Sequence, residues 1–424
     1  MYRVWKPQYE IELANKKAMF HEPSDGLLGS NFNWEDVQRV ISQKLGDEVQ
    51  LGDEKSIVPL GVGVGLQSLL GVIHSDTKSE NFPEVFVLKI GSPIALIKAL
   101  SDQASKVPPE AAAELVQGFV RFLPPCHNSE IYFYEKFKSL EKQEIPQIPD
   151  YFFGETLRLL EDGSYTKGCI GIEYIQNVHS LSPAQNFSDD QVKQVLKVLA
   201  KLEVAFLGVP ESEQSTPHNG FSGLYVTFED WFLEMNNQLF GAVLPLAPFT
   251  EEFSKILPDL ITSKEVDTIS TILGIKNVLV HGDLWAANIL WNSENDLEKI
   301  VDFQMIHFGL AATDLTRFFN TCLSAEDRKL KWKDYLRFFY DALVKEVEDS
   351  GQEVPYTYEQ LELTYRLVYP RSSAYLLPPL TAVLENISKL PDNEIKLHAM
   401  STIISKLAGI YSDIIEEHKN RPAI

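Results

Sequence analysis

The chain has 424 residues, and its 60 acidic against 38 basic side chains give a formal net charge of −22. A charge of this sign repels phosphate backbones and anionic lipid headgroups, so a nucleic-acid-binding or membrane-surface role is disfavoured. The three cysteines are far apart, without a CxxC pair, and the N-terminus is charged where a signal peptide needs an apolar stretch. We therefore expect a cytoplasmic protein with two or three domains or one two-lobed fold.

The first part of the chain is predicted to be rich in β-structure. Asn33 can cap a first helix, which Gly46 would end. Short apolar runs bounded by turn residues are typical of an antiparallel sheet, and paired prolines at 108–109 and 124–125 predict chain breaks. The expected elements are a helix over 34–45, strands over 56–60, 66–73 and 84–90, a helix near 129–140, and strands over 151–160 and 168–175.

The second part is predicted to be mainly helical. Ser188 and Gln191 form a capping box before an amphipathic run that Gly208 ends. Three short β runs, at 277–280, 288–291 and 299–303, interrupt the helices. We predict an α+β protein with a β-rich N-terminal lobe over 1–172, including an N-terminal extension, a connection over 173–179 and a helical C-terminal lobe over 180–424. A cleft between the lobes is the expected ligand site.

The most informative motif is His281-Gly-Asp283, followed by Asn288 and then by Asp302 at the end of the next β run. Phosphoryl transfer needs oxygen ligands for Mg²⁺ on separate backbone segments and a carboxylate facing the attacking hydroxyl. Asn288 and Asp302 are the predicted metal ligands, and Asp283 is the predicted catalytic base. The alternative is that these are ordinary turn and strand-end residues.

A kinase also needs a strand lysine for the nucleotide phosphates and a helix carboxylate that holds this lysine. Lys89 lies inside the apolar run 86–90, where an unpaired charge is costly. Glu130 begins the following helix and is its predicted partner, although Glu135 and Glu141 share that helix.

Two weaker signals concern nucleotide binding. Gly61, Gly63 and Gly65 lie between two predicted strands, where a loop that covers phosphates would lie, although a structural turn would look similar. Glu173 and Ile175 end the last predicted strand of the first lobe, where backbone groups could contact an adenine ring.

The segment after Asp302 indicates the substrate class. About ten residues separate it from the helix that contains Asp314, and no Ala-Pro-Glu sequence follows. A peptide-binding activation segment is therefore not expected, which favours a small molecule over a protein substrate. Asp314 either caps its helix or braces the catalytic loop.

Taken together, the run VLVHGDLWAANILW, the segment KIVDFQ and the segment ATDLTRFF resemble the ecdysteroid-kinase-like branch of the choline kinase and aminoglycoside phosphotransferase superfamily. The resemblance extends over most of the chain. It implies a protein-kinase-like two-lobed fold and ATP- and Mg²⁺-dependent phosphorylation of a hydroxyl on a small metabolite. It also implies that Asp283 is the base, that Asn288 and Asp302 bind magnesium, and that Lys89 pairs with Glu130. Gln304 stands where protein kinases have glycine, and the glycine loop is atypical.

Two other functions are compatible with the sequence. One is a pseudokinase that binds a nucleotide or metabolite without turnover. The other is a hydrolase in which His281 and Asp283 bind a metal ion, with His307 as the nearest further histidine. For the kinase, the acidic net charge favours a cationic alcohol as acceptor, whereas the family resemblance equally allows a neutral sterol or glycoside.

Overall fold

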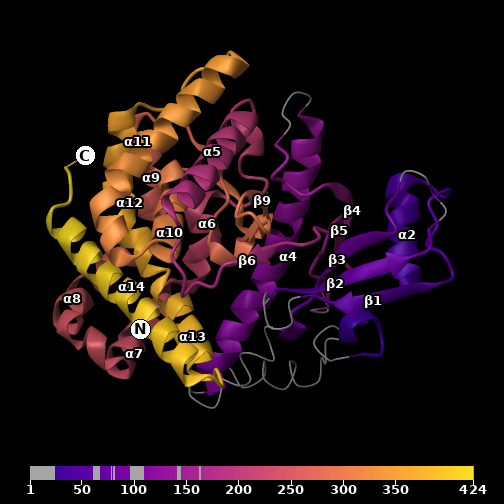
Figure 1. Ribbon diagram of the computed structural model, residues 1–424, viewed down its shortest axis with the longest axis horizontal. Coiled ribbons are helices and arrows are strands. Elements are labelled where there is room, and N and C mark those ends of the chain that lie inside the picture. Colours follow the sequence, from indigo (N-terminus) through magenta and orange to yellow (C-terminus); the bar gives the residue numbers. More distant parts are fainter. Residues whose placement is uncertain are drawn as a thin grey trace. The chain divides into compact units, whose positions relative to one another are not determined.

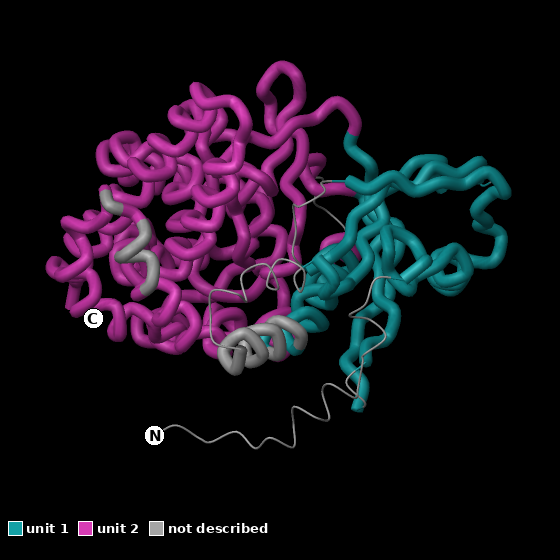
Figure 2. Tube along the Cα trace, turned by 90° about the horizontal axis from the view of Figure 1, so that it is seen from below, with its two compact units in different colours: residues 1–135, 150–175 teal, residues 136–149, 176–424 magenta. Residues whose placement is uncertain are grey.

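The computed structural model describes residues 24–60, 67–77, 79, 82–95, 109–140, 145–161 and 164–423. The predicted phosphate loop with Gly61, Gly63 and Gly65 lies outside these described residues. The chain divides into two compact units, drawn in different colours in Figure 2. Unit 1 comprises 1–135 and 150–175, and unit 2 comprises 136–149 and 176–424. The predicted assignment of functions to an N-terminal lobe over 1–172, a connection over 173–179 and a C-terminal lobe over 180–424 stays a prediction.

Unit 1 is built on one antiparallel sheet whose strands lie in the order β1-β2-β3-β5-β4. The predicted strands are confirmed, with ends shifted by a few residues. Strand β3 lies in the middle of the sheet and is buried along most of its length, since it pairs with β2 on one side and β5 on the other. The strands are β1 (Lys55–Pro59), β2 (Ser68–Ser75), β3 (Val85–Gly91), β4 (Tyr151–Glu155) and β5 (Cys169–Glu173).

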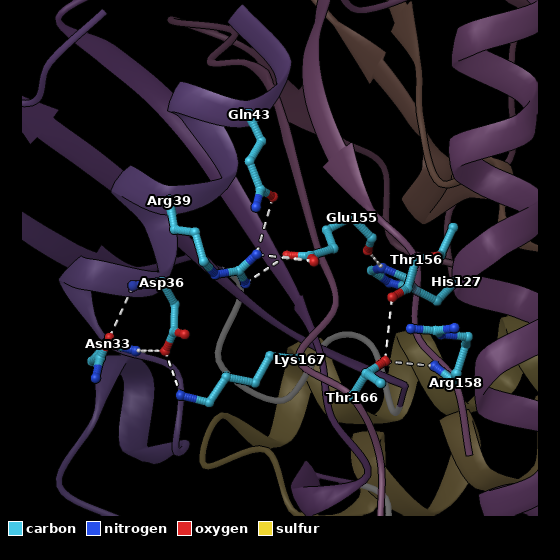
Figure 3. Close-up of polar contacts among 10 residues, drawn as sticks. All are labelled: Asn33, Asp36, Arg39, Gln43, His127, Glu155, Thr156, Arg158, Thr166 and Lys167. Atoms are coloured by element: carbon cyan, nitrogen blue, oxygen red, sulfur yellow. Dashed lines mark hydrogen bonds and ion pairs between the residues drawn. The ribbon is translucent and has the colours of Figure 1, made fainter. Parts of the chain in front are cut away.

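Helix α2 (Trp34–Leu45) packs beside this sheet (Figure 1). Asn33 caps it as predicted, and Asp36 completes a capping box: the Asn33 side chain accepts the backbone N–H of Asp36, and the Asp36 carboxylate accepts that of Asn33. The apolar face joins the core of the unit, and two ion pairs link the helix to β4 and to the segment before β5 (Figure 3). Arg39 contacts Glu155 at 2.7 Å, and Lys167 contacts Asp36 at 2.5 Å.

Helix α4 (Pro109–Ser139) contradicts one expectation from the sequence. Pro124 and Pro125 lie inside it, so the predicted break at this point is wrong. A proline within a helix removes a backbone hydrogen bond and crowds the preceding turn. Here the residues around the prolines are held by packing, since Leu123 and Cys126 are buried on either side. Tertiary packing has overridden the local preference for a break.

Unit 2 contains helices α5 to α14 and two small antiparallel sheets. Helix α5 begins at the predicted capping box of Ser188 and Gln191 and packs against α11, while α12 packs against both α10 and α14. The helices are α5 (Asp189–Phe206), α6 (Gly220–Tyr225), α7 (Glu229–Ala242), α8 (Thr250–Leu260), α9 (Ser263–Leu273), α10 (Ala311–Cys322), α11 (Ala325–Ser350), α12 (Tyr358–Ala374), α13 (Leu377–Ser388) and α14 (Asn393–Lys419).

The two small sheets of unit 2 hold the segments that carry the central motif. Strand β7 (Val278–Val280) pairs with β10 (His307–Gly309), and β8 (Ile289–Trp291) pairs with β9 (Leu297–Ile300) and with β6 (His179–Ser180). The motif residues therefore leave β7 and enter β8, while Asp302 follows β9. The predicted α+β class, with a β-rich first part and a helical second part, is confirmed. In the part of the chain that the structure describes, no helix has the length and apolar character needed to cross a membrane.

Candidate active site

The loop from β7 to β8 is organised around His281. Its Nδ1 accepts the backbone N–H of Asp283 at 3.2 Å, and its Nε2 lies 3.1 Å from the carbonyl oxygen of Val301, to which it donates in the tautomer that this network assigns. Burial lowers the pKa of His281 to about 4, so the ring is neutral at physiological pH. Because both ring nitrogens are engaged with the backbone, His281 is not available to bind a hydrolytic metal.

Asp314, in the first turn of α10, braces the same loop. Its Oδ2 accepts the backbone N–H of His281 at 2.6 Å, and its Oδ1 accepts that of Gly282 at 2.9 Å. Helix α10 begins three residues earlier, at Ala311, without a capping side chain. Of the two roles considered for Asp314, the structure therefore shows the brace. Burial raises the pKa of Asp314 to about 6, and the two backbone donors oppose this shift.

Gly282 allows the loop to pass close to the neighbouring segment. Its φ of +79° lies in the left-handed region, and a Cβ at this position would lie 2.1 Å from the carbonyl oxygen of Met305. No side chain fits at that distance, so glycine is required between His281 and Asp283.

Asp283 lies at the centre of the contacts in this loop. Asn288 Nδ2 donates to the carbonyl oxygen of Asp283 at 2.9 Å and lies 3.3 Å from its Oδ2. The guanidinium of Arg317, on α10, forms an ion pair with Oδ1. Burial raises the pKa of Asp283 to about 6, while the positive charge of Arg317 acts in the opposite direction. The structure therefore brings Asp283 and Asn288 together and adds Arg317 to them.

Asn288 and Asp302 are held in register by the hairpin of β8 and β9. The backbone N–H of Val301 donates to the carbonyl oxygen of Asn288 at 3.0 Å, and Asp302 follows directly. Asp302 has a φ of +69°, an uncommon conformation for a residue other than glycine, and Gln304 Nε2 lies 3.3 Å from its Oδ2. Such strained backbone positions cluster at functional sites.

The donor set of Asn288 and Asp302 fits a hard cation such as Mg²⁺, which prefers carboxylate and amide oxygens. Asn288 uses its amide nitrogen towards Asp283, and among the described residues its amide oxygen accepts no hydrogen bond. Within those same residues, no group of three or more His, Cys, Asp or Glu side chains could hold a metal ion. Two protein ligands suit Mg²⁺, which is commonly bound by one or two side chains together with substrate phosphates and water.

Lys89 and Glu130 form the predicted ion pair within unit 1. Lys89 Nζ lies 2.5 Å from Glu130 Oε2, and the two side chains are 6% and 1% exposed. Glu135 is half exposed and lies 3.6 Å from Lys44 instead. Glu141 lies outside the described residues. The ambiguity about which helix carboxylate holds the lysine is resolved in favour of Glu130.

Glu173 ends β5, and Ile175 follows it at the end of unit 1. The backbone N–H of Glu173 donates to the carbonyl oxygen of Asp150 at 2.8 Å, and the backbone N–H of Asp150 donates to Glu173 Oε2 at 3.1 Å. These contacts fix the end of the strand. A role for Glu173 and Ile175 in binding an adenine ring stays a prediction.

The sequence analysis missed Arg317. A signal for it was present, because this is the one basic side chain in the segment DLTRFF, whose other residues from Asp314 to Phe319 are buried. A buried position for an arginine needs an anionic partner, and the sequence offered no way to identify that partner as Asp283.

The chain belongs to the family DUF1679, whose model is described as "Uncharacterized oxidoreductase dhs-27" and matches residues 20–422. One relative, the "Uncharacterized kinase-like protein D1044.1" of Caenorhabditis elegans, is 25% identical over 252 residues, which are 56% of this chain and 61% of that protein. Another, the "Uncharacterized oxidoreductase dhs-27" of the same organism, is 22% identical over 324 residues, 72% of this chain and 37% of that protein. The chain thus spans less than two thirds of the length of either relative.

Two solved structures align with most of this chain at low sequence identity. The ethanolamine kinase of Plasmodium vivax is 13% identical, with a TM-score of 0.41 and coverage of 95% of this chain and 96% of its own. The choline kinase LicA of Streptococcus pneumoniae is 13% identical, with a TM-score of 0.38 and coverage of 88% and 98%. The kinase-like relative agrees with the kinase resemblance predicted from the central motif, and the ecdysteroid-kinase-like branch stays a prediction.

Proposed function

We propose that this member of the DUF1679 family is a kinase that transfers the γ-phosphoryl group of ATP, in the presence of Mg²⁺, to a hydroxyl group of a small metabolite. The observation that carries the proposal is the braced loop around Asp283. Asp314 holds the backbone of this loop, and Asn288 is hydrogen-bonded to Asp283. Phosphoryl transfer depends mainly on positioning and charge, and a loop held in this way supplies both.

In the proposed reaction, the acceptor oxygen attacks the γ-phosphorus, and the bond between this phosphorus and the β,γ-bridging oxygen breaks. The acceptor proton passes to the carboxylate of Asp283, and ADP is the leaving group. Asn288 and Asp302 would hold Mg²⁺, which when bound neutralises negative charge on the phosphates. Lys89, kept in place by Glu130, would contact the α- and β-phosphates.

The chain that follows Asp302 supports a small acceptor. After one turn, residues 307–309 form β10, which pairs with β7, and α10 begins at Ala311. This segment is therefore used for the sheet and for the brace on the catalytic loop. It contains no extended stretch that could align a peptide substrate.

The proposal can be tested by incubating the purified protein with γ-labelled ATP, Mg²⁺ and a metabolite extract. We expect label in a low-mass hydroxylated compound with the wild-type protein. For Asp283→Asn, turnover should fall by about a hundredfold or more while nucleotide binding is retained, because general-base and positioning effects are of this size. Asp259→Asn, at a side chain that is 70% exposed, is the matched control and should label the compound normally.

A second measurement examines the metal ligand. Asp302→Ala should weaken ATP binding in the presence of Mg²⁺ more than in its absence, as measured by calorimetry. Equal losses under the two conditions would exclude Asp302 as a magnesium ligand. ATP binding by the wild-type protein without any transfer of label would instead indicate a pseudokinase, and Asp283-dependent labelling of proteins alone would indicate a protein kinase.

A further inference from the structure

Arg317 brings a positive charge to Asp283 from outside the catalytic loop. The four residues between Asp283 and Asn288 are Leu, Trp, Ala and Ala, so this part of the loop has no cation of its own. Arg317 lies on α10, one turn after the brace residue Asp314, and its side chain is 16% exposed. Helix α10 therefore both braces the loop and places a guanidinium against Asp283.

Most of the hydrogen-bonding capacity of this guanidinium is unused. An arginine side chain has five N–H donors in a fixed planar arrangement. Here Nη2 donates to Asp283 Oδ1, while Nε is buried and, among the described residues, has no acceptor. Because Nε is buried, a ligand cannot reach it. The side chain is nevertheless 16% exposed, and among the described residues Nη1 has no acceptor, so the Nη groups are the donors that a further acceptor can reach.

The missing acceptor is expected to be an anionic oxygen. A guanidinium matches phosphoryl and carboxylate groups, to which it can donate two parallel hydrogen bonds. Although burial opposes its charge, the neighbouring carboxylate of Asp283 raises the pKa of Arg317, so it stays a cation. Under the proposed function, the acceptor hydroxyl lies within hydrogen-bond distance of Asp283. Arg317 contacts the same carboxylate, so it lies beside the proposed position of that hydroxyl.

We propose that Arg317 forms an anion site beside Asp283 and binds phosphoryl or carboxylate oxygens of the reacting ligands. The inference rests on the proposed function, which it deepens. The oxygens come either from the γ-phosphoryl group of ATP or from an acidic group of the acceptor. In the first case Arg317 is a catalytic residue that stabilises the transferring group, as an arginine supplied within the same chain does in other phosphoryl-transfer sites. In the second case it selects acidic acceptors.

The test compares nucleotide binding in Arg317→Met with that in the wild-type protein. Calorimetry with Mg²⁺ gives the dissociation constants of ATP and of ADP, and of ADP with aluminium fluoride, which mimics the transferring phosphoryl group. If the γ-phosphoryl group is the ligand, the ratio of the ATP to the ADP dissociation constant should rise about tenfold or more, because a hydrogen bond to a charged group is lost. The enhancement of ADP binding by aluminium fluoride should fall as well.

A second arm uses inorganic phosphate and succinate, titrated into protein saturated with ADP. If the oxygens come from the acceptor, one of these anions should bind to the wild-type protein and not to Arg317→Met, while the ratio for ATP and ADP stays unchanged. If Arg317 serves only to hold α10, its substitution should change the melting temperature but neither the ratio of the ATP to the ADP dissociation constant nor the binding of anions. Unchanged nucleotide ratios together with unchanged anion binding would therefore overturn the proposal.

Two further variants keep the test decisive. Arg366→Met removes another guanidinium–carboxylate pair, that with Glu417 at 3.0 Å, and should leave every binding constant unchanged. If Arg317→Met does not fold, because it leaves Asp283 without its cation, Arg317→Met with Asp283→Asn removes both charges and is measured in the same way. A wild-type protein that binds no ATP would refute the proposed function, whereas the phosphate and succinate titrations, repeated in the absence of ADP, would still decide whether Arg317 binds anions.

Discussion

The ion pair between Lys89 and Glu130 makes a quantitative prediction about unit 1. Both side chains are almost fully buried, in the central strand of the sheet and in α4. Removing one partner of a buried pair leaves a charge without compensation and typically costs about 3–5 kcal/mol. Lys89→Met and Glu130→Met should each lose stability of this size. A domain of 150–250 residues loses about 2–4 °C in melting temperature per kcal/mol, so each midpoint should fall by roughly 10 °C.

The double variant distinguishes pairing from packing. Because Lys89→Met with Glu130→Met removes both charges of this pair, its loss of stability should be clearly smaller than the sum of the two single losses. ATP affinity should nevertheless fall by about tenfold or more in all variants that lack Lys89, because a hydrogen bond from a charged donor to the phosphates is lost. Thermal unfolding followed by circular dichroism and calorimetry with ATP measure the two effects.

Glu135→Gln is the matched control, since this carboxylate lies on the same helix and its pair with Lys44 is half exposed. Exposed pairs contribute at most about 1 kcal/mol, so its melting temperature should change by a few degrees at most. Additive losses in the double variant of Lys89 and Glu130 would refute the reasoning, because they would show that the two charges do not stabilise each other.

Three further predictions concern single residues. Asp314→Ala leaves two backbone N–H groups without their acceptor and should destabilise the protein by about 1–3 kcal/mol or more in urea unfolding, with a parallel loss of turnover; unchanged stability would exclude the brace. Gly282→Ala should reduce the yield of folded protein, because its Cβ would lie 2.1 Å from Met305 O; a normal melting temperature would contradict this. Burial lowers the pKa of His127, which contacts the Glu155 carbonyl (Figure 3), to about 4. As the pH falls from 6.5 to 4, only the unfolded state gains this proton, so the free energy of unfolding of the wild-type protein decreases. Relative to wild type, His127→Gln should therefore gain up to about 3 kcal/mol of stability at pH 4. The same difference in stability between the two proteins at pH 7 and at pH 4, measured by urea unfolding, would contradict this.

Features set by a few neighbouring residues could be predicted from the sequence. The cap at Asn33 and the capping box at Ser188 each depend on residues at one helix start, and both are observed. The turn between β8 and β9 is equally local, since Asn292 Oδ1 accepts two backbone N–H groups within it. Local chemistry determines such elements, so a linear pattern is sufficient to identify them.

Features that depend on long-range packing were harder to predict. The sequence placed three glutamates on the helix after Pro125, and only the fold shows that Glu130 is the one against Lys89. The continuation of α4 through Pro124 and the contact of Arg317 with Asp283 were missed, because each depends on residues far away in the sequence. The same is true of Asp314. Its position near the start of a helix did not reveal whether it caps that helix or accepts hydrogen bonds from the loop at His281 and Gly282.

The hairpin of β8 and β9 determines where the protein can tolerate insertions. Asn288 and Asp302 lie at the open end of the hairpin, and their spacing follows from the pairing of Ile289 with Ile300. The turn at 292–296 is at the opposite end. Residues added to that turn cost little loop entropy and leave the pairing intact. A single residue inserted between Lys299 and Ile300 would instead shift the pairing of Ile300 with Ile289 by one position and change the position of Asp302 relative to Asn288. Length variation in this segment is therefore expected in the turn and not in the strands.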